Sequence, residues 1–244
     1  MIMNMCEVTE ILYEGKSKIL YRCKDEVLIL VKYKDSVTAF NGEKSDELFG
    51  KGRLNAAISN LIYEYLEVNG IKTHLVKVID ESSVLVKKAE IIPAEVIVRN
   101  VAAGSFSKKY GVDEGVALPH PTVEFSLKSD TLGDPLINVS HITALGLATS
   151  AELEEMKRLS LLINELLSGL FQKAGIRLID FKLEFGRAAE SGELLLCDEI
   201  SPDSCRLWQI GTDCKLDKDR YRRDLGGVLD SYEEVLRRLQ GVEL

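Results

Sequence analysis

Three charged side chains alternate with apolar residues in one segment of this sequence, and their types and spacing could support catalysis. Asp180, Lys182 and Glu184 stand two positions apart within residues 178–186, and the residues between them are apolar. Alternate side chains of a strand share a face, so these three groups are expected to lie side by side. Strands disfavour aspartate, lysine and glutamate, which favours a functional role. An amphipathic strand with one wetted face would show the same alternation.

A second acidic group follows on the next predicted strand and its turn, at Asp198, Glu199 and Asp203. A hairpin that brings Glu184 near Asp198 would supply two hard oxygen ligands. Sites that bind Mg²⁺ together with phosphates commonly use one or two carboxylates. Glu184 and Asp198 are therefore the candidate metal ligands.

A glycine and two lysines in residues 14–18 could bind phosphate. The backbone N–H groups of such a turn and the ammonium groups of Lys16 and Lys18 can both reach phosphate oxygens. The segment is not a Walker A loop, because Glu10 stands where that motif has its first glycine. A solvated hairpin turn is the simpler interpretation of this segment taken alone.

Two arginines stand close to small or acidic residues and could hold an anionic substrate. Arg99 lies in a β-rich stretch that ends in a small-residue turn at Ser105, and Arg206 follows Asp203 by three positions. A guanidinium can bind phosphate or carboxylate through two parallel hydrogen bonds. A surface salt-bridge network fits these residues equally well. The three histidines have no metal-ligand spacing.

The elements that must position these residues follow from hydrophobic spacing. Two helices are strongly indicated, one with apolar positions from Leu54 to Leu66 and one over residues 150–173 with a capping box at Thr149 and Glu152. Strands are predicted at 19–21, 27–33, 73–80, 83–88, 95–101, 176–185 and 193–200, and further helices at 218–225 and 228–239. Residues 102–148 show little periodicity and are predicted to be an ordered functional loop.

The order of these elements favours an α+β fold. Strands cluster in the sequence and do not alternate strictly with helices, as they would in a doubly wound sheet. Two strand groups meet at Pro93, which suggests an N-terminal domain at 1–91 and a C-terminal domain at 92–244. The C-terminal helices could pack back on the first domain.

Composition sets the broad class of the protein. The 244 residues carry 31 Lys and Arg against 39 Asp and Glu, a net charge of −8, which argues against a nucleic-acid binder. The longest apolar runs are far shorter than a membrane span, and the N-terminus does not resemble a signal peptide. Five cysteines without a CxxC pattern suggest neither disulfides nor a zinc site. We expect a reduced, cytoplasmic, soluble protein.

Taken together, these segments resemble one family, SAICAR synthetase of purine biosynthesis. The motifs, in the order and spacing of the family, are LYEGKSK (12–18), VTAFNGEKSDELFGKGRLNAAIS (37–59), PAEVIVRNVAAGS (93–105), DPLIN (134–138), LIDFKLEFG (178–186), DEISPDSCRLW (198–208) and DKDRYRRDLGG (217–227). They cover nearly the whole chain, and several are long enough to be specific.

The resemblance implies an ATP-dependent ligase with an acyl-phosphate intermediate. Such an enzyme joins L-aspartate to the carboxylate of carboxyaminoimidazole ribonucleotide (CAIR) and yields SAICAR, ADP and phosphate. It also implies an α+β fold of two parts with ATP in the cleft between them, loosely similar to protein kinases and ATP-grasp enzymes. ATP and Mg²⁺ are the implied cofactors, and a homodimer is the implied assembly.

The resemblance also assigns tasks to individual residues. The ATP-binding set is Gly15, Lys16, Ser17, Lys18 and Lys87, with a hinge beside adenine at 87–92. The catalytic set is Lys182, Asp180 and Lys16. The set for CAIR or aspartate is Arg99, Ser105, Asp180, Asp203, Arg206, Asn41, Lys128 and Arg222. Glu184 and Asp198 would hold Mg²⁺.

Three other functions compete with this interpretation. Another ATP-dependent enzyme of the kinase or ATP-grasp type would need a different acceptor pocket, which the motif from Arg99 to Ser105 argues against. A non-catalytic nucleotide-binding module is disfavoured because Lys16, Glu184 and Asp198 are all present. A structural protein gives no reason for polar groups on the inner face of the hairpin.

Overall fold

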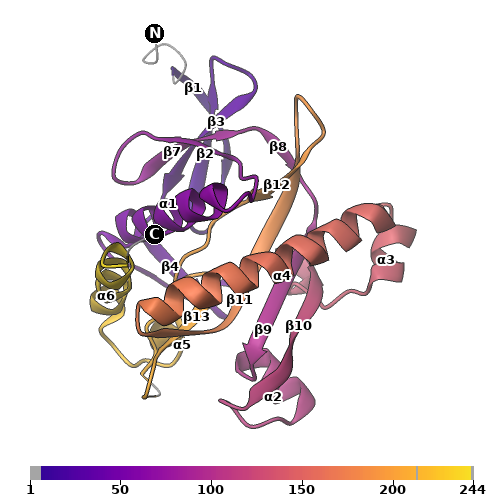
Figure 1. The fold of residues 1–244 in the computed structure, drawn as a ribbon. Coiled ribbons are helices and arrows are strands. Elements are labelled where there is room, and N and C mark those ends of the chain that lie inside the picture. The colour runs from indigo at the N-terminus through magenta and orange to yellow at the C-terminus, as the bar shows by residue number, and fades with distance from the viewer. Residues whose placement is uncertain (1–6, 213, 243–244) are drawn as a thin grey trace.

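The computed structural model describes residues 7–212 and 214–242, and describes Asn41 by its backbone alone. Two antiparallel sheets form the centre of the molecule (Figure 1). The first has the strand order β1 (Val8–Glu14), β2 (Lys18–Cys23), β3 (Leu28–Tyr33), β7 (Ser83–Lys87) and β6 (Leu75–Val78). Helix α1 (Lys51–Val68) packs on one face of it, where Ala56 joins the buried side chains of Val31, Tyr33, Val84 and Val86.

The second sheet is built around the long strand β11 (Ile176–Ala188). Its main path is β10 (Ala117–Leu127), β9 (Ala94–Val101), β11 and β12 (Leu194–Cys197), and β8 (Ala89–Ile91) and β13 (Cys205–Gln209) also pair with β11. Helix α4 (Ser150–Lys173) lies across this sheet (Figure 1). Phe181, Leu183 and Phe185 of β11 belong to the same buried cluster as Met156 and Leu167 of α4. Strand β11 is therefore fixed on its apolar face along most of its length.

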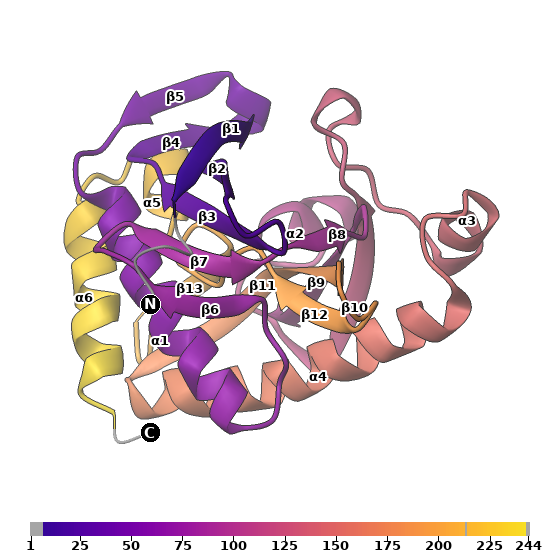
Figure 2. The same ribbon diagram turned by 90° about the horizontal axis from the view of Figure 1, so that it is seen from above.

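The remaining elements are short and connect or cover the sheets. They are β4 (Ser36–Ala39), β5 (Lys44–Glu47), α2 (Gly104–Tyr110), α3 (Val139–Ala144), α5 (Asp219–Arg222), α6 (Val228–Gln240) and two 3-10 turns, Phe40–Gly42 and Asp130–Leu132. Helix α6 lies beside α1, so the C-terminal end of the chain packs back on the N-terminal part (Figure 2).

The structure confirms the α+β class and most predicted elements, but the middle of the chain differs from the prediction. Residues 102–148, expected to be loop, contain α2, β10 and α3. Periodicity did not reveal them because α2 has no buried residue and β10 carries Pro119 and Pro121 on an edge strand. Strands β1, β4, β5, β8 and β13 were not predicted either. The helix predicted at 218–225 is shorter, Asp219–Arg222, and the strand predicted at 193–200 is Leu194–Cys197.

A register shift changes the expected alternation at the start of β11. The pairing of β11 with β13 is irregular between Leu178 and Asp180. As a result Leu178 joins the main core, whereas Ile179 packs with Val101 and Trp208 in a separate cluster. From Asp180 onward the alternation holds, and the charged side chains of Lys182 and Glu184 contact each other.

The capping box at the start of α4 also forms an ion pair with the second sheet. The Thr149 hydroxyl accepts a hydrogen bond from the Glu152 N–H, and the Glu152 carboxylate accepts one from the Thr149 N–H. Arg187 of β11 donates to the same carboxylate at 2.5 Å. The Arg187 hydrogen bond, aided by those from Thr149, lowers the pKa of Glu152 to about 2. Glu152 therefore ties the start of α4 to the second sheet.

Replacing Glu152 with Gln is expected to lower the free energy of unfolding at pH 7 by about 1 kcal/mol, as for a partly exposed ion pair. A carboxylate with a lowered pKa in the folded state stabilises the fold above its ordinary pKa and loses that effect as pH falls. The difference from the parent chain should shrink as pH falls from about 4.5 to about 2. Urea unfolding at several pH values measures this, and a difference independent of pH would contradict it.

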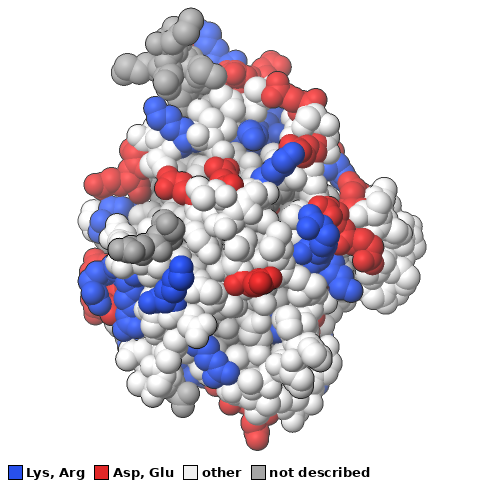
Figure 3. All heavy atoms as spheres, in the orientation of Figure 1, with Lys and Arg blue, Asp and Glu red and all other residues white. Residues whose placement is uncertain are grey.

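Charged side chains of both signs are interspersed over the face drawn in Figure 3, which is the face of Figure 1. Neither sign therefore dominates this face, and the charges relevant to a ligand are those of local clusters. None of the helices in the described part of the chain is long and apolar enough to cross a membrane.

Candidate active site

A cleft of about 700 Å³ is lined by residues from both sheets. One part of its wall is apolar and comes mainly from β2, β3, β7 and β8. These residues are Leu20, Ile29, Val31, Val86, Ala89 and Ile91. The opposite part is strongly charged and comes from β11 and from the segments around β12. The cleft thus combines an apolar region and an ionic region in a single cavity.

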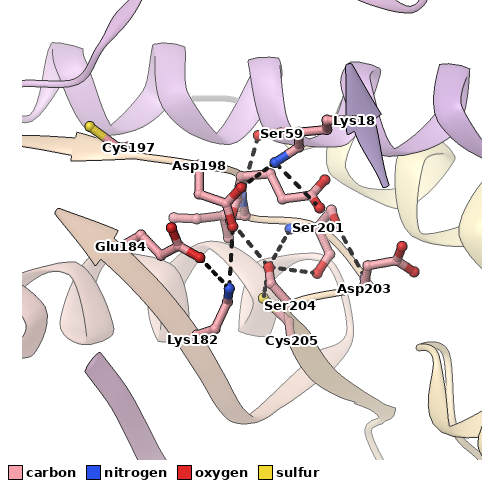
Figure 4. Close-up of polar contacts among 12 residues, drawn as sticks. Lys18, Ser59, Lys182, Glu184, Cys197, Asp198, Ser201, Asp203, Ser204 and Cys205 are labelled. Atoms are coloured by element: carbon pink, nitrogen blue, oxygen red, sulfur yellow. Dashed lines mark hydrogen bonds and ion pairs between the residues drawn. The ribbon is translucent and has the colours of Figure 1, made fainter. Parts of the chain in front are cut away.

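Lys182 is the centre of the charged part of the cleft. Its Nζ lies 2.6 Å from Glu184 Oε1, 2.9 Å from Glu95 Oε1 and 3.4 Å from Asp198 Oδ2. Figure 4 shows Lys182 pointing between the side chains of Glu184 and Asp198. The register of the hairpin causes this arrangement, because Glu184 pairs with Cys197 and Asp198 comes next in the chain. The expected meeting of Glu184 and Asp198 is therefore found, with Lys182 as the link.

Two more lysines reach the same carboxylates. Lys18 of β2 pairs with Asp198 and lies 3.5 Å from Glu199 Oε1, and Lys128 pairs with Glu184. Asp198 adopts a left-handed backbone conformation with φ of 65°. Such a conformation is uncommon outside glycine and persists where the surroundings enforce it, typically at functional sites.

The charges in this cluster stabilise one another. Although burial alone would raise it, Lys18, Lys182 and Lys128 hold the pKa of Asp198 well below its usual range. Burial opposes the charged form of Lys182, but Glu184, Asp198 and Glu95 outweigh it and raise its pKa well above the ordinary value. Both groups are therefore ionised at neutral pH.

The predicted phosphate loop borders the cleft. Gly15, Lys16, Ser17 and Lys18 all line it, and the loop is closed by a hydrogen bond from the Gly15 N–H to the Lys18 carbonyl at 2.8 Å. Lys16 reaches across to Asp130, 2.7 Å away. Lys87 at the predicted hinge also lines the cleft. The ATP set named from the resemblance is therefore brought to one cavity.

The arginines form a separate cluster beside the cleft. Arg99 Nη1 lies 2.7 Å from Asp180 Oδ2, and Arg206 Nη1 lies 2.9 Å from the same oxygen. Arg99 also donates to Glu124 at 2.9 Å and to the Ser105 hydroxyl at 3.3 Å. Arg99, Ser105, Asp180 and Arg206 contact one another but are not among the residues that line the cleft.

A chain of ion pairs joins this arginine cluster to the cleft. Arg206 Nε lies 3.0 Å from Asp219 Oδ2, and Arg222 Nη1 lies 2.6 Å from Asp219 Oδ1. Arg222 lines the cleft together with Asp203 and Lys128. Asn41 lies in the 3-10 turn Phe40–Gly42, and its side chain is outside what the structure describes.

Several cleft residues had not been identified from the sequence. They are Glu95, Asp130, Asp134, Lys218 and His74. His74, one of the three histidines without metal-ligand spacing, borders the cleft, and burial lowers its pKa to about 4. Periodicity carried a usable signal only for Glu95, which shares the strand of Arg99 and lies opposite Ser126 of β10.

The donor set fits Mg²⁺ bound jointly with phosphate. Among residues 7–212 and 214–242 no group of three or more His, Cys, Asp or Glu side chains is arranged to hold a metal alone. Glu184 and Asp198 offer two hard carboxylates in a cleft that Lys16 and Lys18 also line. Mg²⁺ usually keeps several waters and uses one or two carboxylates plus substrate phosphates.

Comparisons with known proteins point to the same family that the sequence motifs resemble. The family model described as SAICAR synthetase matches residues 11–239. A Bacillus subtilis (strain 168) relative named phosphoribosylaminoimidazole-succinocarboxamide synthase is 53% identical over 233 residues, which are 96% of each chain.

Solved structures of proteins with the same description share the fold. The enzyme from Ehrlichia chaffeensis is 45% identical, with a TM-score of 0.93 over 96% of this chain and all of its own. A SAICAR synthetase in complex with ADP is 42% identical, with a TM-score of 0.91 over 98% of this chain and 99% of its own. A Saccharomyces cerevisiae SAICAR synthase, 22% identical with a TM-score of 0.79 over 97% of this chain and 96% of its own, extends the likeness of fold.

Proposed function

The chain belongs to the SAICAR synthetase family, and from this premise we propose how its cleft carries out the reaction. The enzyme is an ATP-dependent ligase that joins L-aspartate to the carboxylate of CAIR in purine biosynthesis, giving SAICAR, ADP and phosphate. The assignment of residues rests on the position of Lys182. Its ammonium group lies between Glu184 and Asp198 in a cleft bordered by the Gly15 loop.

ATP is placed with its adenine in the apolar region and its phosphates toward the charged region. Ile29, Val31 and Val86 supply apolar surface that suits a base, and Lys87, next to Val86 in the chain, also lines the cleft. The loop of Gly15 to Lys18 covers the phosphates with its N–H and ammonium groups. The relative that was solved with ADP supports a nucleotide in this fold.

Glu184 and Asp198 would hold Mg²⁺ on the phosphates. The ion supplies charge neutralisation on the phosphoryl oxygens when bound. Lys182 stabilises the charge on the transferring phosphoryl group, since phosphoryl transfer depends mainly on positioning and electrostatics. Lys16, which is half exposed in its pair with Asp130, is free to exchange that partner for a phosphate.

CAIR and aspartate are assigned to the charged side of the cleft and the adjoining arginine cluster. Arg99, Ser105 and Arg206 bind CAIR and its phosphate, and Asp180 orients the two guanidinium groups. The proposed set of substrate contacts also includes Asp203, Lys128, Arg222 and Asn41. The two arginines already pair with carboxylates, so an incoming phosphate meets groups whose orientation is fixed in advance.

The reaction proceeds in two steps. A carboxylate oxygen of CAIR attacks the γ-phosphorus of ATP, the bond to the bridging oxygen breaks, and ADP leaves. The amine of L-aspartate then attacks the acyl carbon, phosphate leaves, and the amine gives up a proton as the amide forms. Lys182 serves the first step, where negative charge develops on the γ-phosphoryl oxygens.

We further propose the arrangement of the whole molecule. Residues 1–91 form the nucleotide part and residues 92–244 the substrate part, and the chain acts as a cytoplasmic homodimer on small molecules. The free thiols of Cys197 and Cys205 support a reducing compartment. Light scattering that reports the mass of a single chain would contradict the dimer.

The function is tested by ADP release from the purified protein with ATP, Mg²⁺, CAIR and L-aspartate, leaving out each in turn. Repeated turnover is expected only with the complete set, together with SAICAR detected by mass spectrometry. Repeated turnover without aspartate, beyond one equivalent of ADP per enzyme, would keep the phosphoryl transfer but change the nucleophile. Absence of release from the folded protein would contradict the proposal.

A further inference from the structure

Two buried donors outside the cleft hold the carboxylate of Asp203. Lys51 Nζ lies 2.6 Å from Asp203 Oδ2, and the Tyr232 hydroxyl donates to Asp203 Oδ1 at 2.6 Å. Lys51 and Tyr232 are both 0% exposed, and neither lines the cleft, whereas Asp203 does. Each carboxylate oxygen of Asp203 therefore has one donor from the protein interior behind it.

The place of Lys51 is fixed by the way α1 begins. Gly50 has φ of 93°, and Gly52 approaches β3 so closely that a Cβ would lie 2.8 Å from the Tyr33 carbonyl oxygen. The Gly52 N–H also donates to Asp35 Oδ1 at 2.9 Å. Because the first turn of α1 is held in this way, its first side chain is aimed at Asp203 from a rigid element.

Tyr232 comes from the other end of the chain. It lies in α6, and its ring packs in a buried cluster with Val37, Leu54 and Val228. The ring is thus held by apolar contacts that do not need the hydroxyl. The hydrogen bond from the hydroxyl to Asp203 is separate from this packing. A substitution can therefore remove the hydroxyl and keep the ring.

Stability alone gives no reason to bury a lysine here. A buried ion pair contributes little net stability, because desolvation of both charges offsets their attraction. The turn that carries Asp203 is already closed by other bonds, from the Ser204 N–H to the Ser201 carbonyl at 3.0 Å and from the Ser201 N–H to the Ser204 hydroxyl at 3.0 Å. Figure 4 shows Asp203 on this turn beside both serines.

Asp203 is ionised in this setting. Burial alone would raise its pKa, but Lys218 and Lys51 hold the pKa well below its usual range. An ionised carboxylate with one oxygen on Lys51 and the other on Tyr232 keeps further lone pairs for donors in the cleft.

We propose that Lys51 and Tyr232 are positioning residues that fix the Asp203 carboxylate for a hydroxyl or amino donor of the nucleotide substrate. The proposal rests on the proposed function, in which Asp203 binds CAIR or aspartate. Through these two contacts, α1 and α6 set the geometry of the substrate side of the cleft.

The Tyr232→Phe variant tests the proposal because it removes only the hydroxyl. Loss of a group that orients a binding side chain costs about 10- to 100-fold at metal sites, and a loss of about tenfold in kcat/KM for CAIR is expected here. The affinity for ADP, measured by calorimetry, should stay unchanged. The matched control is Tyr221→Phe, which removes a hydroxyl of the same cluster that donates to Asp46 at 2.8 Å.

A double variant separates positioning from structure. In an Asp203→Ala background, which removes both oxygens, adding Tyr232→Phe should have little further effect on CAIR use if Tyr232 acts through the carboxylate. A tenfold loss that persists in that background would overturn the proposal. So would a Tyr232→Phe enzyme with the same CAIR kinetics as Tyr221→Phe.

The Lys51→Gln variant provides a second test, because it alters the contact to the other carboxylate oxygen of Asp203, Oδ2. It keeps a hydrogen-bond donor on a side chain that is one bond shorter and removes the charge, and a comparable loss in kcat/KM for CAIR is expected in the folded enzyme. An unchanged value would overturn the role of Lys51. Failure of the parent chain to form SAICAR would instead contradict the proposed function, so the two failures are distinguishable.

Discussion

Replacing Asp198 with Asn is expected to lower kcat by about 10³-fold, the order seen when one preorganised electrostatic group is removed from a transition state. The proposed metal site would keep only Glu184 as a charged ligand. The concentration of Mg²⁺ needed for half-maximal rate should rise in the same variant. Steady-state SAICAR formation over a range of Mg²⁺ concentrations measures both quantities.

The fold should tolerate this change. Asn is among the residues that accept the left-handed conformation found at position 198, where φ is 65°. Lys18 would keep Glu199, 3.5 Å away, as a partner. The thermal unfolding midpoint should therefore move by only a few degrees. Glu234→Gln is the control, since that carboxylate pairs with Arg237 and Arg238 on α6. Normal turnover by Asp198→Asn would contradict the metal assignment.

The charged hairpin was predictable because its geometry is local. Alternation along one strand placed Lys182 and Glu184 on one face, and a short connection to the next strand brought Asp198 within reach. The long helix at 150–173 was equally accessible, since its apolar stripe and its capping box agree. Both features depend on residues close together in the sequence or on one repeated spacing.

The contacts that escaped prediction join residues far apart. Lys51 and Asp203 are 152 positions apart, and no periodicity links the start of α1 to a turn after β12. Helix α2 buries no residue, and the edge strand β10 buries only two residues near its end, so neither shows a periodic burial pattern. The arginines were recognised as anion-binding groups. Their pairing with Asp180 and their place outside the lining of the cleft required the fold.

Replacing Lys182 with Met should separate metal binding from catalysis. The side chain neutralises Glu184, Asp198 and Glu95, so its loss leaves three carboxylates that attract cations more strongly. Half-maximal Mg²⁺ activation is therefore expected at a lower concentration than in the parent enzyme. At the same time kcat should fall by about 10²- to 10³-fold, because the ammonium that we propose stabilises the transferring phosphoryl group is gone.

These opposite shifts identify the role of Lys182 more sharply than loss of activity alone. A lysine that only held the carboxylates apart would, on removal, weaken Mg²⁺ activation and the rate together. A lysine that contacts the phosphoryl group lowers the rate even at saturating Mg²⁺. Single-turnover measurement of ADP formation with CAIR present isolates that step from product release. An unchanged single-turnover rate in Lys182→Met would remove Lys182 from phosphoryl transfer and leave it as a partner of Glu184 and Asp198.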